Sequence, residues 1–379
     1  MLRLYVLAFL SLFIIGKTNA QDDVPSLLGD EPPVSATTPK NEEASEKNTV
    51  KTEEVTSPAA EEKKEENVLF NFLGIKIPDF IPTSIKKPLP KIESNENSLQ
   101  ILTQKAENGD LQSQLKLGFA YLYGSDKLAV DYTKAFHFYQ LAAEQNDLTG
   151  LNNLGTLYYN GLGISRDTRK AAELFIKSAE LGNAEAATNL AFMYISGNGI
   201  EKDIATGIKY FQQAADDNIL AKFMIGCALY HGTFIPRDYI KAAPMIKAAA
   251  DAGLDEAQIL LADIYIKGQG YPQNYANAVK YLNYAVTQGN VQAMLRLADI
   301  YSGIIKYPSD IVIAHTLYNL AYVRGIQNAQ SRINQLQAKM SIDQLMQAQQ
   351  EASNYQEKPS QLTSYVHQTF GNELCSLLQ

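Results

Sequence analysis

Apolar and small residues recur along positions 98–325 with a period of about 36 residues. In each period a Leu or Ile precedes a small residue, and a Tyr or Leu stands three positions after it. Residues three positions apart lie on the same face of a helix, so the first half of every period is predicted to be an amphipathic helix. The small residues that mark the six periods are Gly118, Gly155, Ala191, Gly226, Ala262 and Ala298.

A second helix is predicted in every period. It opens with Asp or Asn, whose side chain can accept hydrogen bonds from the free backbone N–H groups of a first helical turn. These capping residues are Asp131, Asp167, Asp203, Asp238, Asn274 and Asp310. Each second helix is predicted to end at a residue type that can adopt the left-handed conformation, namely Asn146, Gly182, Asp217, Gly253, Gly289 or Gly325.

Helix pairs of this kind bury their apolar faces against neighbouring pairs. The pattern therefore predicts an all-α fold, a right-handed α-solenoid of about six helix-turn-helix repeats over 98–325, with no β-sheet. C-terminal capping helices are expected over 326–353, and a capping box from Ser341 to Gln344 opens the second of them. The polar tail, 354–379, is expected to have little order apart from a short helical turn within 374–378.

The first 20 residues have the features of a signal peptide. Arg3 supplies a positive charge, 4–15 is an apolar run broken only by Ser11, and 18–20 resembles a cleavage site before Gln21. This run is too short to be a stable membrane span, which takes about 20 residues. We therefore expect export of a mature chain that begins at Gln21. The chain contains no Asn-x-Ser/Thr sequon, which favours a Gram-negative periplasm, with a secreted protein as the alternative.

Two segments separate this leader from the repeats. Residues 21–67 are rich in Glu, Lys, Pro, Ser and Thr and contain no aromatic residue, which predicts a disordered acidic linker. Residues 68–97 combine apolar residues with prolines and are interpreted as an extended strap on the first repeat. A partner-docking or membrane-touching segment is the alternative for this strap.

The net charge is concentrated in the linker. The whole chain has 41 acidic and 33 basic residues and a net charge of −8. Because the linker holds most of this excess, the repeats are nearly neutral. This balance argues against binding to duplex nucleic acid.

The repeat unit resembles the Sel-one-like repeat, a relative of the tetratricopeptide repeat. Leu154, Gly155 and Tyr158 match its first helix, and the loops 161–167 and 197–203 match its pattern of Gly-x-Gly, hydrophobic, x, x, Asp. The resemblance covers about residues 106–325, and the loops of repeats one, four and six depart from it. It implies a scaffold for protein-protein interaction in signalling, assembly or host contact. A cysteine-rich branch linked to β-lactam or peptidoglycan hydrolysis is the alternative, but that branch has regularly spaced cysteine pairs and this chain has 2 cysteines.

No catalytic residue, cofactor site or metal site is indicated by the sequence. The Gly-x-Gly triplets at 161, 197 and 268 lack a third glycine and follow a helix, which argues against a phosphate-binding loop. Cys227 and His231 stand one helical turn apart, as a nucleophile and base or two metal ligands could, but no third ligand recurs nearby. A buried, inert thiol is therefore favoured for Cys227. One disulfide, between Cys227 and Cys375, is possible.

The resemblance to tetratricopeptide arrays implies that a protein or peptide partner binds in a concave groove lined by the first helices. The positions one and four residues after each small residue would face this groove. The predicted protein-binding residues are Phe119, Leu122, Thr156, Tyr159, Phe192, Ile195, Tyr230 and Ile266. The same positions also hold Cys227, Asp263, Asp299 and Ser302, so the groove is expected to change from apolar to acidic along its length.

A double variant follows from this prediction. Phe192→Ala with Tyr159→Ala is expected to lose the partner and to keep its helical content. The alternative is that these side chains pack between repeats.

Overall fold

The computed structural model describes residues 96–124, 128–304, 307–371 and 373–378. The predicted leader, linker and nearly all of the strap lie outside these residues. The described residues form sixteen α-helices and one short 3-10 helix, η4 (Cys375–Leu378), with no β-strand among them, as an α-solenoid requires. The α-helices are α1 (Glu96–Glu107), α2 (Leu111–Tyr123), α3 (Tyr132–Glu144), α4 (Leu148–Asn160), α5 (Thr168–Glu180), α6 (Ala184–Ser196), α7 (Ile204–Ala214), α8 (Ile219–His231), α9 (Tyr239–Asp251), α10 (Asp255–Lys267), α11 (Tyr275–Thr287), α12 (Val291–Tyr301), α13 (Ile311–Val323), α14 (Ala329–Gln337), α15 (Ile342–Asn354) and α16 (Gln361–Phe370).

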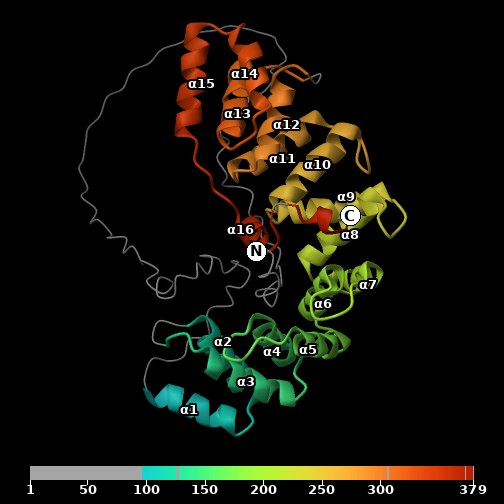
Figure 1. Ribbon diagram of the computed structural model, residues 1–379, viewed down its shortest axis with the longest axis vertical. Helices are drawn as coiled ribbons and strands as arrows, with labels where there is room; N and C mark the ends of the chain where they lie inside the picture. The colour runs from blue at the N-terminus through green and yellow to red at the C-terminus, as the bar shows by residue number, and fades with distance from the viewer. Residues whose placement is uncertain (1–95, 125–127, 305–306, 372, 379) are drawn as a thin grey trace, which may run out of the picture.

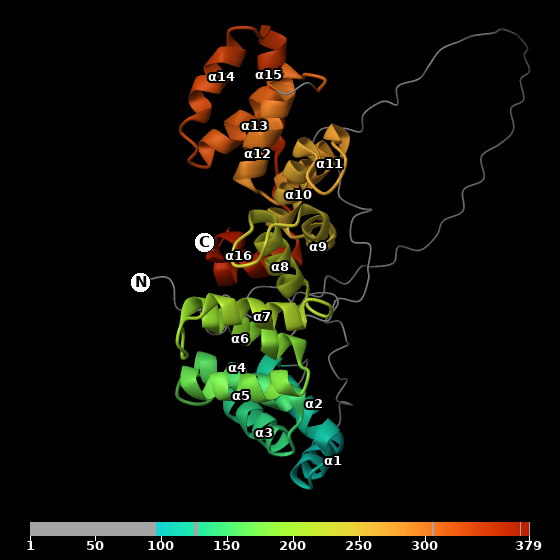
Figure 2. The same cartoon turned by 90° about the vertical axis from the view of Figure 1, so that its right-hand side faces the viewer.

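The helices from α2 to α13 form six antiparallel pairs, one for each period of the sequence. Successive pairs stack into a curved array, which is seen from two sides in Figure 1 and Figure 2. In Figure 1, α4 and α6 lie nearer the inner side of the curve than α5 and α7. In the part of the chain that the structure covers, no helix has the length and apolar character needed to cross a membrane.

The predicted caps of the second helices are confirmed. Each side-chain oxygen accepts a hydrogen bond from the backbone N–H three residues further on, at 2.9 to 3.1 Å. The first helices are capped in the same way by Asp110, Asp147, Asn183, Asn218 and Asn290. The exception is α10, where Leu254 occupies the cap position and provides no side-chain hydrogen bond.

Removing one of these helix caps should lower the stability of the protein by a measurable amount. Asp167 accepts from the Lys170 N–H at 2.9 Å and is exposed, so its replacement removes one hydrogen bond without leaving a cavity. We expect Asp167→Ala to lower the free energy of unfolding by about 1 kcal/mol, because the first turn of α5 then has an unsatisfied donor. Asp167→Asn keeps an acceptor and should stay close to the wild type. Urea unfolding followed by circular dichroism measures both, and equal stability of the alanine variant would contradict the assigned cap.

The small residues of the first helices make room for large side chains of the second helices. A Cβ atom added at Gly118 would lie 2.8 Å from the Tyr139 ring, and one at Gly155 would lie 2.9 Å from the Phe175 ring. Both rings are buried. The recurrence of a small residue in the sequence therefore reflects close packing of the two helices of each repeat.

Five of the six predicted helix ends adopt the left-handed conformation, namely Asn146 and the four glycines. The prediction is wrong for Asp217, which is absent from the residues with positive φ. The reason is local: α7 ends early, at Ala214, and Asn218 then caps α8.

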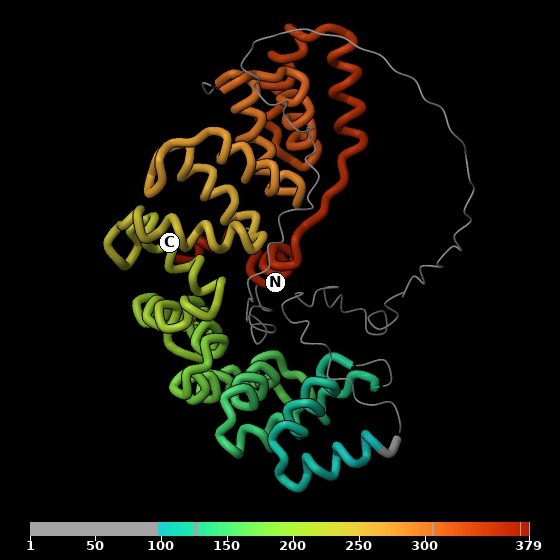
Figure 3. Tube along the Cα trace, turned by 180° about the vertical axis from the view of Figure 1, so that it is seen from behind, coloured from blue at the N-terminus to red at the C-terminus, as the bar shows by residue number. Residues whose placement is uncertain are grey.

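The described residues beyond Asn354 form the expected short helical turn, at 375–378, and, contrary to expectation, a further helix, α16. The chain runs back from α15 toward the middle of the array, forms α16 and ends in η4 (Figure 3). We call residues 355–371 and 373–378 the C-terminal segment. This arrangement has a physical reason, because apolar residues scattered along the segment are buried. These residues are Leu362, Tyr365, Val366, Leu374 and Leu378.

Candidate protein-binding surface

Two predicted groove positions contact the C-terminal segment. The ring of Phe192 is 2% exposed and lies 4.9 Å from Phe211 of α7 and 4.4 Å from Phe370 of α16, measured between ring centroids. Cys227 of α8 forms a disulfide with Cys375, with a Cα–Cα distance of 5.6 Å that is usual for such a bond. The inner side of α6 and α8 is therefore covered by residues from the end of the chain.

The disulfide decides between the interpretations of Cys227. Its sulfur is bonded to Cys375 and is not a free thiol beside His231. A Cys-His pair for catalysis is not available in this form of the protein. Among the described residues, no group of three or more His, Cys, Asp or Glu could hold a metal ion.

Two tyrosines that were predicted to line the groove instead form hydrogen bonds between neighbouring repeats. The Tyr159 hydroxyl is hydrogen-bonded to the side-chain amide of Asn198, and the Tyr230 hydroxyl donates to Gln269 at 2.9 Å. Both partners lie in the loop of the following repeat. The expectation that these positions are open to a partner is wrong, because large side chains here fill the space between repeats. The predicted groove residues that are buried are Thr156, Tyr159, Phe192, Ile195 and Tyr230.

The remaining predicted apolar residues keep part of their surface. Phe119, Leu122 and Ile266 are neither buried nor fully exposed. The Phe119 ring packs on Tyr123 of the same helix at 4.6 Å between centroids. Partner binding through these three residues stays a prediction.

The predicted acidic end of the groove has partners within the chain. Asp263 forms an ion pair with Arg296, and Asp299 accepts a hydrogen bond from the Tyr318 hydroxyl. Ser302 donates to the Asp299 carbonyl at 2.9 Å. These two carboxylates are thus engaged in holding adjacent helices together.

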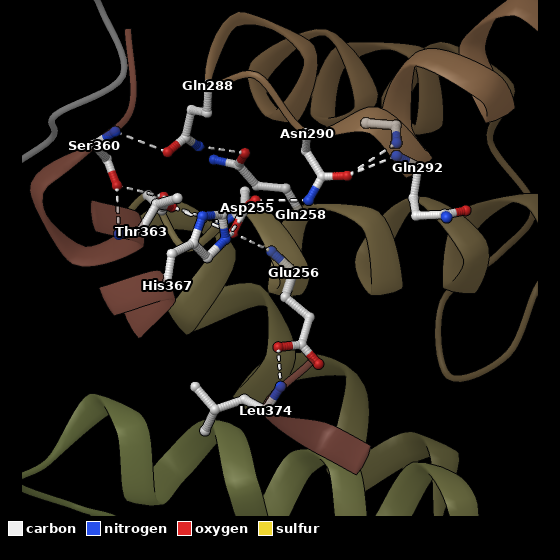
Figure 4. A network of polar contacts seen from close by, with 12 residues as sticks. Asp255, Glu256, Gln258, Gln288, Asn290, Gln292, Ser360, Thr363, His367 and Leu374 are labelled. Atoms are coloured by element: carbon white, nitrogen blue, oxygen red, sulfur yellow. Dashed lines mark hydrogen bonds and ion pairs between the residues drawn. The ribbon is translucent and has the colours of Figure 1, made fainter. Parts of the chain in front are cut away.

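The N-terminus of α10 obtains its cap from the C-terminal segment (Figure 4). The Asp255 N–H donates to the Thr363 hydroxyl at 3.0 Å, and that hydroxyl donates to the Gly253 carbonyl at 2.9 Å. The buried Asp255 carboxylate lies 3.1 Å from Nε2 of His367 and accepts from the Asn290 amide at 2.6 Å. α16 thereby provides the side-chain acceptor that Leu254 lacks.

A second carboxylate of α10 binds the end of the C-terminal segment. Glu256 accepts from the backbone N–H groups of Leu374 at 2.6 Å and Cys375 at 2.9 Å. Burial raises the pKa of Glu256 to about 7, although the two hydrogen bonds act in the opposite direction. Carboxylate oxygens facing two successive N–H groups suit the start of the short helix η4.

The pKa of His367 is also raised. Burial disfavours the imidazolium, but the hydrogen bond to Asp255 and the charges of Asp255 and Glu256 outweigh it and hold the pKa above 6.5. In the folded chain, the pKa values of His367 and Glu256 are therefore both above their ordinary values.

The stretch before α16 makes further hydrogen bonds, mostly to the end of α11. The Lys358 N–H donates to the Thr287 carbonyl at 2.8 Å, and the Ser360 N–H donates to the Gln288 side chain at 2.8 Å. The Tyr355 hydroxyl donates to the Val286 carbonyl at 2.6 Å. The C-terminal segment is thus held along its length.

A cavity of about 420 Å³ lies where α10, α12 and the C-terminal segment meet. Its lining includes Glu256, Asp263, Asn290, His367 and Cys375. Several of these side chains already have hydrogen-bond or ion-pair partners in the chain. The cavity is therefore a polar space next to the contact between α10 and the C-terminal segment. Among the contact residues from the C-terminal segment, Cys375 alone was anticipated from the sequence, as a possible disulfide partner of Cys227. For the contacts with α10, the break in the cap pattern at Leu254 was the available signal.

Comparison with known proteins identifies the repeats. The Sel1 repeat family matches residues 111–147, 149–183, 184–218, 219–254, 255–290 and 291–325. A stretch of 55 residues is 44% identical to HRD3B of Arabidopsis thaliana, an ERAD-associated E3 ubiquitin-protein ligase component, over 14% of this chain and 9% of that protein. HRD3A of the same plant is 31% identical over 68 residues, 18% of this chain and 10% of that protein. The chain thus spans about a tenth of the length of the curated relatives that it matches.

A solved structure of another repeat protein has a similar fold. The protective antigen c5321 of uropathogenic Escherichia coli strains, which displays an SLR fold, is similar with a TM-score of 0.59 and 24% identity. The match covers 74% of this chain and 62% of that one, and it supports the arrangement of the helices alone. Because the repeat matches run from residue 111 to residue 325 and cover more than half of the chain, the protein belongs to the Sel1 repeat family.

Proposed function

We propose that this chain is an exported scaffold that binds a protein partner on the inner side of its solenoid. Sel1 repeats mediate protein-protein interaction, and a curved array presents an extended surface for it. The observation that carries the proposal is that the inner side already holds a polypeptide. The C-terminal segment lies there and uses an aromatic contact, hydrogen bonds to backbone groups and an ionisable pair, as a bound peptide would.

Two features support export. Residues 1–20 have the composition of a signal peptide, and Cys227 is joined to Cys375. Disulfides form and persist in oxidising compartments such as the periplasm or the extracellular space. The proposed location is a Gram-negative periplasm, or the medium outside the cell.

Export predicts a defined N-terminus. Expressed with its leader in a Gram-negative host, the protein should be recovered from the periplasmic fraction and should begin at Gln21. N-terminal sequencing measures this directly. Intact Met1 on the recovered protein, or recovery in the cytoplasmic fraction alone, would contradict export.

Binding is tested with the predicted residues that keep exposed surface. A Phe119→Ala, Leu122→Ala double variant should capture a cross-linked partner at least tenfold less well, because apolar anchors in an interface commonly contribute about 1 to 2 kcal/mol each. Ile240→Ala on the outer helix α9 is the matched control, since Ile240 is 77% exposed. Capture from native extract, compared by quantitative mass spectrometry, gives the ratio. Equal capture by all three proteins would place binding elsewhere.

A further inference from the structure

We propose that the inner surface beneath α16 is a peptide-docking surface whose resident occupant is the chain's own C-terminal segment, and that breaking the Cys227–Cys375 disulfide opens it to a partner segment of similar chemistry. This inference rests on the proposed scaffold function and names the surface and its control. The docking surface is formed by Phe192, Cys227, Gly253, Asp255, Glu256 and Gln288.

The C-terminal segment is separate from the repeat array. The repeat matches end at residue 325, and α14 and α15 follow them before the chain turns back. Its hydrogen-bond partners in α10 lie more than 100 residues away in sequence. The segment therefore packs on a surface that the repeats build without it.

Without the C-terminal segment, the docking surface lacks hydrogen-bond partners and one ring contact. The Asp255 N–H in the first turn of α10 would then lose its side-chain acceptor, because Leu254 holds the position that Asp or Asn holds before the other first helices. Asp255 would lose its imidazole partner, and Phe192 would lose the ring of Phe370. A backbone donor without its acceptor, a carboxylate without its imidazole and an aromatic ring without one of its neighbours are together favourable features for binding a peptide.

The occupant defines the partner chemistry. α16 presents apolar side chains at 362, 365, 366 and 370, a spacing that places them on one side of a helix. Thr363 and His367 provide a hydroxyl group and an imidazole to Asp255. A fitting partner is thus a short amphipathic helix with an aromatic residue near its C-terminal end and a histidine or other cation one turn before it.

The disulfide decides whether such a partner can compete. The C-terminal segment is attached at one end through α15 and at the other through Cys375, so it cannot leave while both links exist. A dithiol reductant would transfer two electrons and two protons, giving the thiols of Cys227 and Cys375 and becoming a disulfide itself. The opened segment would remain tethered at one end only and would compete at the effective concentration of a linked peptide.

The probe for the test is a fluorescein-labelled peptide of residues 355–378 with Ser in place of Cys375. Anisotropy is measured with the full-length protein, oxidised or treated with dithiothreitol, and with a Phe370→Ala, Cys375→Ser double variant. The variant keeps the docking surface intact and weakens its own occupant. We expect the probe not to bind to the oxidised protein. It should bind to the double variant at least tenfold more tightly than to the protein treated with dithiothreitol.

Substitutions in the probe keep the protein unchanged. Probe peptides with Phe370→Ala or His367→Ala should bind the double variant at least tenfold less tightly. The inference is overturned if the folded double variant binds no probe, or if the oxidised protein binds it equally well. It is also overturned if size-exclusion chromatography shows that the opened chain dimerises by exchanging segments, because the occupant is then a second copy. If the folded double variant does not bind the probe, but partner capture through Phe119 and Leu122 is intact, this docking surface is rejected. The proposed scaffold function is then unaffected.

Discussion

A Phe192→Ala, Tyr159→Ala double variant is expected to lose most of the stability of the central repeats. Phe192 is buried against Phe211 and Phe370, and Tyr159 is 1% exposed and hydrogen-bonded to the next repeat. Truncating a buried aromatic side chain to alanine costs about 3 to 5 kcal/mol, because apolar contact is lost and a cavity remains. Thermal unfolding followed by circular dichroism measures the change. This result reverses the sequence-based expectation that helical content survives.

The single variants allow the contributions to be separated. Phe119→Ala is the matched control, since Phe119 is partly exposed and should cost about 1 kcal/mol or less. Phe192→Ala should also loosen α16, because it removes the partner of Phe370. A double variant with the stability and helical content of the wild type would contradict the burial described here.

Stability is expected to fall as the pH rises from about 5 to 8. The pKa of Glu256 is raised from 4.5 to about 7 and that of His367 is raised above 6.5, so the folded state binds both protons more tightly than the unfolded state does. The stabilisation is complete below the unfolded pKa values and is lost as the pH passes the folded ones. For Glu256 it amounts to about 3 kcal/mol, at about 1.4 kcal/mol for each pKa unit.

Other groups titrate in different windows or with the opposite sign. The cap carboxylates Asp203 and Asp238 have lowered pKa values, so their contribution is lost only below about pH 4. His231 and His315 have pKa values lowered by burial, which raises stability as the pH increases through about 6.5.

A Glu256→Gln variant isolates the contribution of Glu256 to the pH dependence of stability. Its amide oxygen can still accept from Leu374 or Cys375, but the group no longer titrates. The difference in melting temperature between the variant and the wild type should change in favour of the variant as the pH rises from 5 to 8. Parallel curves for the two proteins would show that Glu256 has an ordinary pKa.

The repeats could be predicted from sequence because each is specified by local residues. A cap such as Asp167 acts on its own helix, and a small residue such as Gly155 faces a ring from the next helix along the chain. Both signals recur in phase, so neighbouring periods support one another. The exception at Asp217 arose where α7 is shorter than its equivalents.

The candidate surface was predicted less well because tertiary contacts decide it. Periodicity placed Tyr159 and Phe192 on the inner side, but it did not show that a neighbouring loop and α16 cover them. The contacts of Asp255 with Thr363 and His367 join residues more than 100 positions apart, and no local pattern encodes that distance. Leu254 was the one local departure that pointed to an external cap.

The C-terminal segment occupies the inner surface of the solenoid, and fluorescence can test this position directly. The chain contains no tryptophan, so Phe370→Trp creates a single tryptophan, at the contact with Phe192, whose emission can be excited selectively. In the oxidised full-length protein, we expect tryptophan emission shifted to the blue and slow quenching by acrylamide. After treatment with dithiothreitol and excess peptide of residues 355–378, the emission should shift to the red and quenching should become fast. Emission of a water-exposed tryptophan in the oxidised protein, before any reduction, would show that α16 does not cover Phe192.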